Sequence, residues 1–100
     1  MSVLHANKEA FDKLRASGAH FLVDFHAKWC GPCRMLSPIL DELGESGVTV
    51  LKIDVDEEGD LAREFGVYSI PALFVIKNGE VTAQAIGLRS KAELEAMLAR

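Results

Sequence analysis

The stretch from residue 21 to residue 33 reads FLVDFHAKWCGPC. Residues 20–26 are almost continuously apolar, which is expected of a strand buried on both faces of a sheet. The only two cysteines of the sequence, Cys30 and Cys33, follow three residues apart at the start of a predicted helix. The stretch therefore predicts a buried strand that leads into a pair of thiols at the N-terminus of a helix.

The residues on either side predict the order β-α-β-α-β-α-β-β-α. The predicted strands cover residues 3–5, 20–26, 48–55, 72–76 and 81–86. The predicted helices cover residues 7–15, with Asn7 as cap, a long segment from Cys33, residues 61–65, and a last segment that begins at Ser90.

Proline, glycine and capping residues mark the ends of these elements. Pro38 lies inside the long helix and should kink it, and Gly44 and Gly47 are expected to close it. Gly66 is a typical residue to follow the third helix. Asn78-Gly79 lies between two apolar runs and predicts a tight hairpin. Ser90 and Glu93 have the spacing of a capping box.

The early β-α-β units predict parallel strands, and the late hairpin predicts antiparallel pairing. We therefore expect an α/β fold with a mixed central sheet of about five strands and about four flanking helices. The 100 residues suit a single domain that spans residues 1–100.

Composition limits the classes of partner. Hydrophobic residues make up 49% and charged residues 26% of the chain, which is typical of a globular domain. The net charge is −4 and the basic residues are scattered, so we expect neither nucleic acid nor a membrane as partner. We find no signal peptide and no apolar segment long enough to cross a membrane. We expect a cytoplasmic monomer.

The spacing of Cys30 and Cys33 favours redox chemistry. Residues i and i+3 share one face of a helix, close enough for a small adjustment to make or break a disulfide. Pro32 fits the first turn of a helix, where its missing N–H is not needed. At that position the helix dipole would stabilise a Cys30 thiolate.

Two other interpretations of the pair remain open. A structural disulfide that closes a loop of about four residues would stabilise the fold by only roughly 2 kcal/mol. A zinc site usually needs four ligands, and the sequence has no second C-x-x-C motif. The three histidines, His5, His20 and His26, lack the spacing of a ligand pair. We therefore expect no metal.

Asp24 interrupts the apolar strand. A buried carboxyl group resists ionisation, so its pKa is expected to rise, which makes it a usable proton acceptor near neutral pH. The alternative is a structural carboxylate that is paired with a nearby lysine.

The segment from Val23 to Cys33 resembles the active-site segment of the thioredoxin family, in particular its bacterial-type members with the motif WCGPC. The resemblance covers almost the whole chain. Three further segments are similar to the central strand, the cis-proline loop and the hairpin of that family: residues 50–56, 66–72 and 77–80.

The resemblance implies a thiol–disulfide oxidoreductase that reduces protein disulfides. Cys30 would attack the target disulfide, Cys33 would resolve the mixed disulfide, and Asp24 would assist proton transfer. Lys52 would lie near Asp24 and compensate its charge. The Cys30–Cys33 disulfide would be the redox centre, with Gly31 and Pro32 between the thiols favouring a reductant.

The resemblance also implies a substrate surface and an electron source. Trp29 would form a flat wall beside Cys30, although a core position is the alternative. Pro71 would be cis and would place the backbone of Ile70 for pairing with a substrate strand, near Gly87. Electrons would come from NADPH through a separate flavoprotein, a thioredoxin reductase, because the chain has no G-x-G-x-x-G motif and should bind no cofactor itself.

Five residues depart from the common pattern of the family. His26 stands where tryptophan is usual, on the same side of the strand as Asp24. It is either a partly buried histidine satisfied by a backbone group or a residue whose cationic form favours the Cys30 thiolate. Lys28 and Arg34 replace other common residues beside the cysteines. Tyr68-Ser69 alters the loop before Ile70 and can change the choice of partner.

Two rival functions differ from that of a reductase. The first is an oxidant or isomerase of the same fold, tuned by His26. The second is a redox-inert adaptor that binds proteins through the surface around Trp29.

Overall fold

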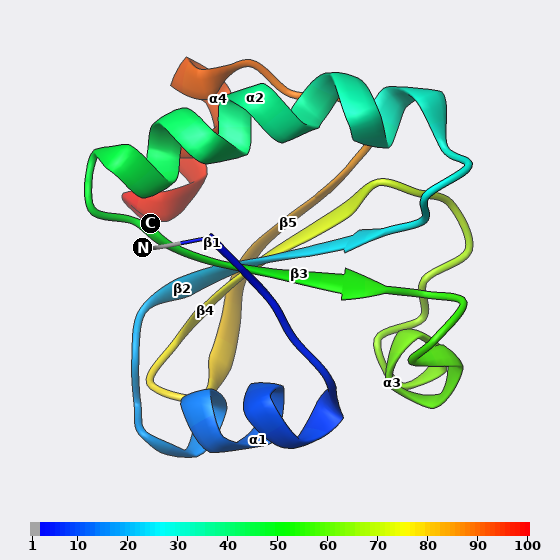
Figure 1. Ribbon diagram of the computed structural model, residues 1–100. Helices are drawn as coiled ribbons and strands as arrows, with labels where there is room; N and C mark the ends of the chain where they lie inside the picture. Colours follow the sequence, from blue (N-terminus) through cyan, green and yellow to red (C-terminus); the bar gives the residue numbers. More distant parts are fainter. Residues whose placement is uncertain (1–2) are drawn as a thin grey trace.

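The computed structural model describes residues 3–100, and their elements follow the predicted order (Figure 1). The strands are β1 (Val3–His5), β2 (Phe21–His26), β3 (Thr49–Asp54), β4 (Ala72–Lys77) and β5 (Glu80–Ile86). The helices are α1 (Lys8–Ala16), α2 (Gly31–Glu45), α3 (Gly59–Glu64) and α4 (Lys91–Leu98).

The five strands form one mixed sheet in the order β1-β3-β2-β4-β5. β3 pairs in parallel with both β1 and β2, whereas β4 pairs antiparallel with β2 and with β5. The predicted parallel strands and C-terminal antiparallel hairpin are therefore confirmed. β2 lies in the centre, and all six of its residues are buried, as its apolar sequence predicts.

Helices cover both faces of the sheet (Figure 1). α1 and α3 lie on one face, which we call the phenylalanine face because all five phenylalanines of the chain pack there: Phe11, Phe21, Phe25, Phe65 and Phe74. α2 and α4 lie on the other face, which we call the α2 face, over an aliphatic core that includes Leu22, Leu36, Leu40 and Leu94. Because side chains alternate along a strand, β2 and β3 contribute to both cores.

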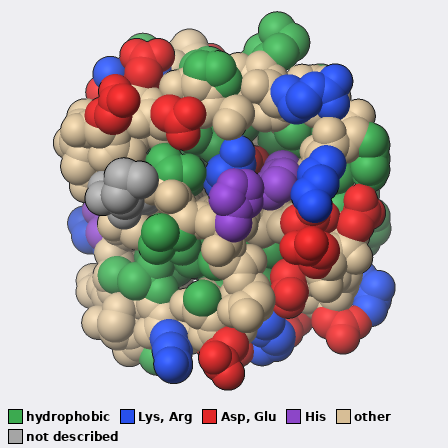
Figure 2. All heavy atoms as spheres, viewed as in Figure 1, with side chains coloured by type: hydrophobic (Ala, Val, Ile, Leu, Met, Phe, Trp, Pro, Cys, Tyr) green, Lys and Arg blue, Asp and Glu red, His purple; other side chains and the backbone are tan. Residues whose placement is uncertain are grey.

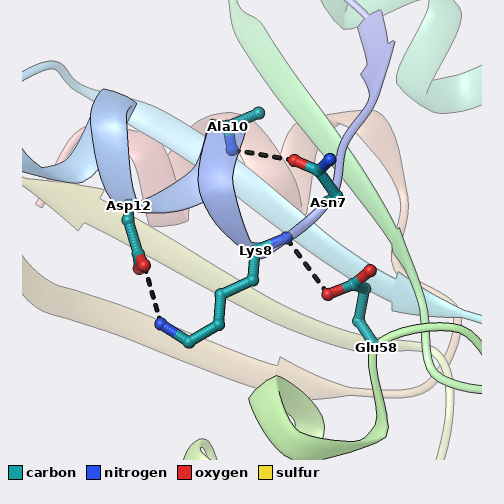
Figure 3. A network of polar contacts seen from close by, with 5 residues as sticks. All are labelled: Asn7, Lys8, Ala10, Asp12 and Glu58. Atoms are coloured by element: carbon teal, nitrogen blue, oxygen red, sulfur yellow. Dashed lines mark hydrogen bonds and ion pairs between the residues drawn. The ribbon is translucent and has the colours of Figure 1, made fainter.

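Polar contacts fix the start of α1 (Figure 3). The side chain of Asn7 accepts a hydrogen bond of 2.9 Å from the backbone N–H of Ala10, which confirms the predicted cap. The backbone N–H of Lys8 donates to Glu58 at 3.1 Å, and its ammonium group pairs with Asp12 at 2.6 Å. The Lys8–Glu58 bond ties the first turn of α1 to the residue that precedes α3.

The boundaries of α2 differ from the prediction. The helix begins at Gly31 rather than at Cys33, because Cys30 serves as its N-cap. It continues through Pro38 and past Gly44 to Glu45, so Gly44 does not close it. Gly47 has a φ of 100°, a left-handed conformation that suits the chain reversal after the helix. The kink at Pro38 stays a prediction.

The other termini match more closely. Asn78 and Gly79 have φ values of 54° and 82°, as a two-residue hairpin turn requires. Ser90 and Glu93 form the predicted capping box at the start of α4. α3 begins and ends earlier than predicted, at Gly59 and Glu64, and Gly66 follows it with a φ of 65°.

Within residues 3–100, no helix is both long enough and apolar enough to cross a membrane.

Candidate active site

The two cysteines form a disulfide at the N-terminus of α2. Their Cα atoms are 5.3 Å apart. Cys30 is the N-cap with extended backbone, and its sulfur accepts a hydrogen bond of 3.2 Å from the backbone N–H of Cys33. Gly31 and Pro32 occupy the first turn, where a proline costs no backbone hydrogen bond. The local sequence thus places one sulfur at the positive end of the helix dipole.

An apolar shell surrounds the disulfide. Cys30 is only 5% exposed, and both cysteines pack with Ala27, Val55 and Ile70. The carbonyl oxygen of Ile70 lies 3.8 Å from the Cys30 sulfur. The backbone before Pro71 therefore lies beside the sulfur predicted to react first.

The Ile70–Pro71 peptide bond is cis, as the family resemblance implied. The backbone N–H of Gly87 donates a hydrogen bond of 2.8 Å to the carbonyl of Pro71. Gly87 has a φ of 95°, a conformation that side chains rarely allow. Tyr68, in the same loop, is 96% exposed.

Trp29 lies on the surface next to Cys30, with 68% of its side chain exposed, which excludes the alternative of a core position. Its indole N–H donates a hydrogen bond of 2.8 Å to Asp56, in the segment after β3. On the other side of the motif, the Arg34 guanidinium donates to the carbonyl of Lys28 at 2.9 Å. The two hydrogen bonds anchor the segment that carries the cysteines, one before Cys30 through Trp29 and one after Cys33 through Arg34.

Asp24 lies in β2 with 0% of its surface exposed. Burial raises the pKa of its carboxyl group from 3.8 to about 7, and the nearby positive charge of Lys52 opposes part of that rise. Asp24 and Lys52 are register partners in β2 and β3. The predicted proximity of the two residues and the burial of Asp24 are therefore confirmed.

Lys52 does not form the direct ion pair that a purely structural Asp24 would need. Its ammonium group donates a hydrogen bond of 3.0 Å to the hydroxyl of Ser37 in α2. Among the described residues, no group donates a hydrogen bond to either carboxylate oxygen of Asp24. Lys52 thus acts on Asp24 through space rather than by contact.

His26 lies at the end of β2 on the α2 face, with 8% of its surface exposed. The backbone partner expected for its ring is not found at Nε2, which has no partner within residues 3–100. Burial and the charge of Lys52 lower the pKa of His26, whereas Asp54 raises it. The cationic ring that would favour the Cys30 thiolate is therefore disfavoured in the folded protein.

The sequence alone did not point to four residues of this region: His5, Ser37, Asp54 and Asp56. The ring centroids of His5 and His26 are 5.9 Å apart in an edge-to-face contact, because β1 brings His5 beside Lys52 on the α2 face. Asp54 is the register partner of His26. If the pairing of β1 with β3 were known, the alternation of side chains along β1 would place His5 on the α2 face beside Lys52.

Within the described part of the chain, no three or more His, Cys, Asp or Glu side chains are arranged to hold a metal ion.

Comparisons with known proteins agree with this geometry. A family model described as thioredoxin matches residues 2–100. The chain belongs to the thioredoxin family. The thioredoxin of Bacillus subtilis is 39% identical over 98% of this chain and 96% of its own length. That of Haemophilus influenzae is 43% identical over 92% of this chain and 90% of its own length.

A solved structure confirms the fold. A mutant thioredoxin from Halobacterium salinarum NRC-1 superposes with a TM-score of 0.88 at 34% identity, over 96% of this chain and 86% of that one. Together with the Cys30–Cys33 disulfide, membership of the thioredoxin family makes the protein a thiol–disulfide oxidoreductase with a redox-active disulfide.

Proposed function

We propose that this chain is a general protein-disulfide reductase of the bacterial thioredoxin type. The observation that carries the proposal is the Cys30–Cys33 disulfide at the N-terminus of α2, beside an exposed indole and a backbone carbonyl. The bacterial relatives named thioredoxin support the same assignment.

In the first step, the Cys30 thiolate attacks one sulfur of a substrate disulfide. The other substrate sulfur leaves as a thiolate, and a mixed disulfide forms. The N-terminus of α2 supports this step because its N–H groups and dipole stabilise negative charge on the Cys30 sulfur.

In the second step, Cys33 loses its proton and attacks the Cys30 sulfur. The bond to the substrate breaks, the reduced substrate leaves, and the Cys30–Cys33 disulfide forms. We assign the proton from Cys33 to Asp24, whose pKa of about 7 suits a base at neutral pH.

The substrate lies across the surface around Cys30. Trp29 offers an exposed aromatic wall, and the Ile70 carbonyl close to the Cys30 sulfur offers a backbone acceptor. Pro71 and Gly87, linked by a backbone hydrogen bond, form the adjoining part of the surface.

Turnover requires reduction of the disulfide from outside. We assign this role to a flavoprotein thioredoxin reductase that draws electrons from NADPH, since the sequence has no G-x-G-x-x-G motif of its own. We place the protein in the cytoplasm, where structural disulfides are rare and a cysteine pair is more often catalytic. We expect it to act as a monomer.

An assay with NADPH, a bacterial thioredoxin reductase and insulin as the disulfide substrate tests the function. The wild-type protein should support continuous NADPH oxidation, and Cys30→Ser should abolish it. Cys33→Ser should instead accumulate a mixed disulfide, visible by mass spectrometry. Insulin reduction by the Cys30→Ser variant would contradict the assignment of the nucleophile.

The reduction potential separates a reductant from an oxidant or isomerase. Equilibration with a dithiol buffer should give a value near about −270 mV, as for thioredoxin. A value of roughly −120 to −180 mV would instead indicate an oxidant or isomerase. The adaptor alternative predicts that a variant with both cysteines changed to serine keeps its biological activity.

A further inference from the structure

The carboxyl group of Asp24 is isolated from solvent. Its exposed fraction is 0%, and no described residue donates a hydrogen bond to it. If Asp24 takes up the proton of Cys33, that proton must leave before the next turnover. The proposed function therefore requires a route that carries this proton from the buried Asp24 to solvent.

Lys52 is the register partner of Asp24 and its charge acts on that carboxyl group, but it is a poor acceptor for this proton. An ammonium group has three donors and no acceptor site. One of these donors is already engaged with the hydroxyl of Ser37. Lys52 can stabilise the charge of Asp24, but it cannot take a proton directly from it.

His26 has the position and the free ring nitrogen that the route needs. It is the next residue of β2 on the same face as Asp24, and the backbone positions of the two residues are about 6.5–7 Å apart along the strand. Its Nε2 is buried and has no partner within residues 3–100. Its ring packs against His5, whose side chain is exposed.

The two histidines link the interior to the surface. Figure 2 shows histidine side chains near the centre of one face, between basic and acidic side chains. A hollow of about 780 Å³ adjoins His5 and is lined by residues that include His5, Ser37 and Lys52. Asp24, His26 and His5 thus form a series from a fully buried group to an exposed one.

The charges that face His26 favour its neutral form. Lys52 from β3, His5 from β1 and Lys28 lower its pKa in addition to burial, and Asp54 from β3 raises it. From α2, Ser37 faces Lys52, and Asp41 and Glu45 line the adjoining hollow. A neutral imidazole can accept a proton at one nitrogen while it donates from the other.

We propose that His26, with His5 beside it, carries the proton of Asp24 to solvent during disulfide reduction. Cys33 gives its proton to the Asp24 carboxylate as its sulfur attacks Cys30 and displaces the substrate thiolate. The proton then passes from Asp24 to the His26 imidazole, and through His5 to solvent, where the released thiolate can take up a proton. The protein dithiol is oxidised, the substrate disulfide is reduced, and Asp24 is again a carboxylate.

Rapid-mixing kinetics can test this route. The reduced protein is mixed with a fluorophore-labelled disulfide peptide at pH 7 in weak buffer, and formation and resolution of the mixed disulfide are followed separately. His26→Phe should slow the resolving step by about tenfold and leave the first step unchanged. Added imidazole should restore the rate, because it replaces the missing proton carrier.

The controls separate this proposal from the role of Asp24 itself. His20→Phe changes an exposed histidine that precedes β2 and should alter neither step. Asp24→Asn should slow the resolving step, and His26→Phe added to it should have no further effect. If Asp24→Asn leaves the resolving step unchanged, the role of Asp24 in the proposed function fails; if only His26→Phe leaves it unchanged, the proton route alone fails.

Structural damage gives a different result from loss of a proton carrier. A His26→Phe variant that is slow but not restored by imidazole would overturn the proposal. If that variant does not fold, as judged by circular dichroism, His26→Gln is measured in the same way, and it should show the same slow, imidazole-dependent step. A His26→Gln variant with the wild-type rate in weak buffer would also overturn the proposal.

Discussion

The two faces of the sheet share strands but differ in chemistry. On the phenylalanine face, Phe25 and its aromatic neighbours pack with ring centroids 5.1–6.1 Å apart. On the α2 face, the core is aliphatic, and near the disulfide it gives way to buried polar groups: Asp24, His26 and Asp54. The buried core of the phenylalanine face is apolar, whereas the α2 face also buries three ionisable side chains.

Neighbours in β2 show this difference most directly. Phe25 and Asp24 are both fully buried, yet they point to opposite faces. Burial of the Phe25 ring stabilises the fold, whereas burial of the Asp24 carboxylate opposes it at neutral pH, because its folded-state pKa is raised to about 7. Stability and chemistry are therefore divided between alternate residues of one strand.

The largest expected effect is on the phenylalanine face. Phe25→Ala should lower the free energy of unfolding by about 3–5 kcal/mol, because it removes a buried ring and leaves a cavity. Urea denaturation measures the change. Leu22→Ala, on the α2 face of the same strand, is the matched comparison and should cost about 2–5 kcal/mol. A loss below about 1 kcal/mol for Phe25→Ala would show that the aromatic cluster does not dominate stability.

The second prediction concerns Asp24, whose substitution should raise rather than lower the free energy of unfolding. Because its pKa is raised in the folded state, the folded protein binds this proton more tightly than the unfolded chain. The contribution of Asp24 to stability should therefore be fully present below about pH 4 and be lost as the pH rises through about 7. Asp24→Asn removes this penalty and should stabilise the protein at pH 8 by up to roughly 4 kcal/mol.

Urea denaturation of the wild type and Asp24→Asn across pH 3–8 tests the sign. The difference between the two proteins should vanish near pH 3, where Asp24 is protonated in both states. A constant difference at all pH values would mean that Asp24 does not titrate with a raised pKa. The same variant should resolve mixed disulfides more slowly, so its gain in stability accompanies a loss of activity.

A smaller effect is expected at the rim of the site. Asp56→Ala removes the acceptor for the Trp29 indole, and loss of one hydrogen bond of about 1 kcal/mol should raise the KM for a protein substrate by about fivefold. Asp56→Asn keeps an acceptor oxygen and should leave KM nearly unchanged. Equal KM values for both variants would show that the indole needs no anchor.

The smallest effects should be the same on both sides of the sheet. Asn7→Ala removes the cap of α1, and Ser90→Ala removes the cap of α4. Each should lower the free energy of unfolding by about 1 kcal/mol. A large difference between the two variants in thermal unfolding would show that the faces differ in their helix ends as well as in their cores.

The sequence predicted the features that depend on local chemistry. The Asn78-Gly79 turn, the Ser90–Glu93 capping box and the buried strand β2 were predicted from residues that are neighbours in the chain. The start of α2 was predicted too late because Cys30 acts as a cap, a role for which cysteine is not a preferred residue.

The features that the sequence alone did not predict depend on topology. His5 and His26 are distant in the sequence and meet only because β1 joins the sheet next to β3. The Ser37 contact of Lys52 likewise depends on how α2 crosses the sheet. The cis bond before Pro71 followed from family resemblance, since most prolines are trans.

The cap at Cys30 has an evolutionary consequence. Serine, threonine, aspartate and asparagine are all better N-cap residues than most, and each could accept the hydrogen bond that Cys33 now donates to sulfur. In a lineage that no longer needed electron transfer, replacement of Cys30 by one of these residues would preserve the N-cap of α2. Redox-inert descendants should therefore be easy to reach from this ancestor, and the persistence of cysteine here would be a record of selection for chemistry alone.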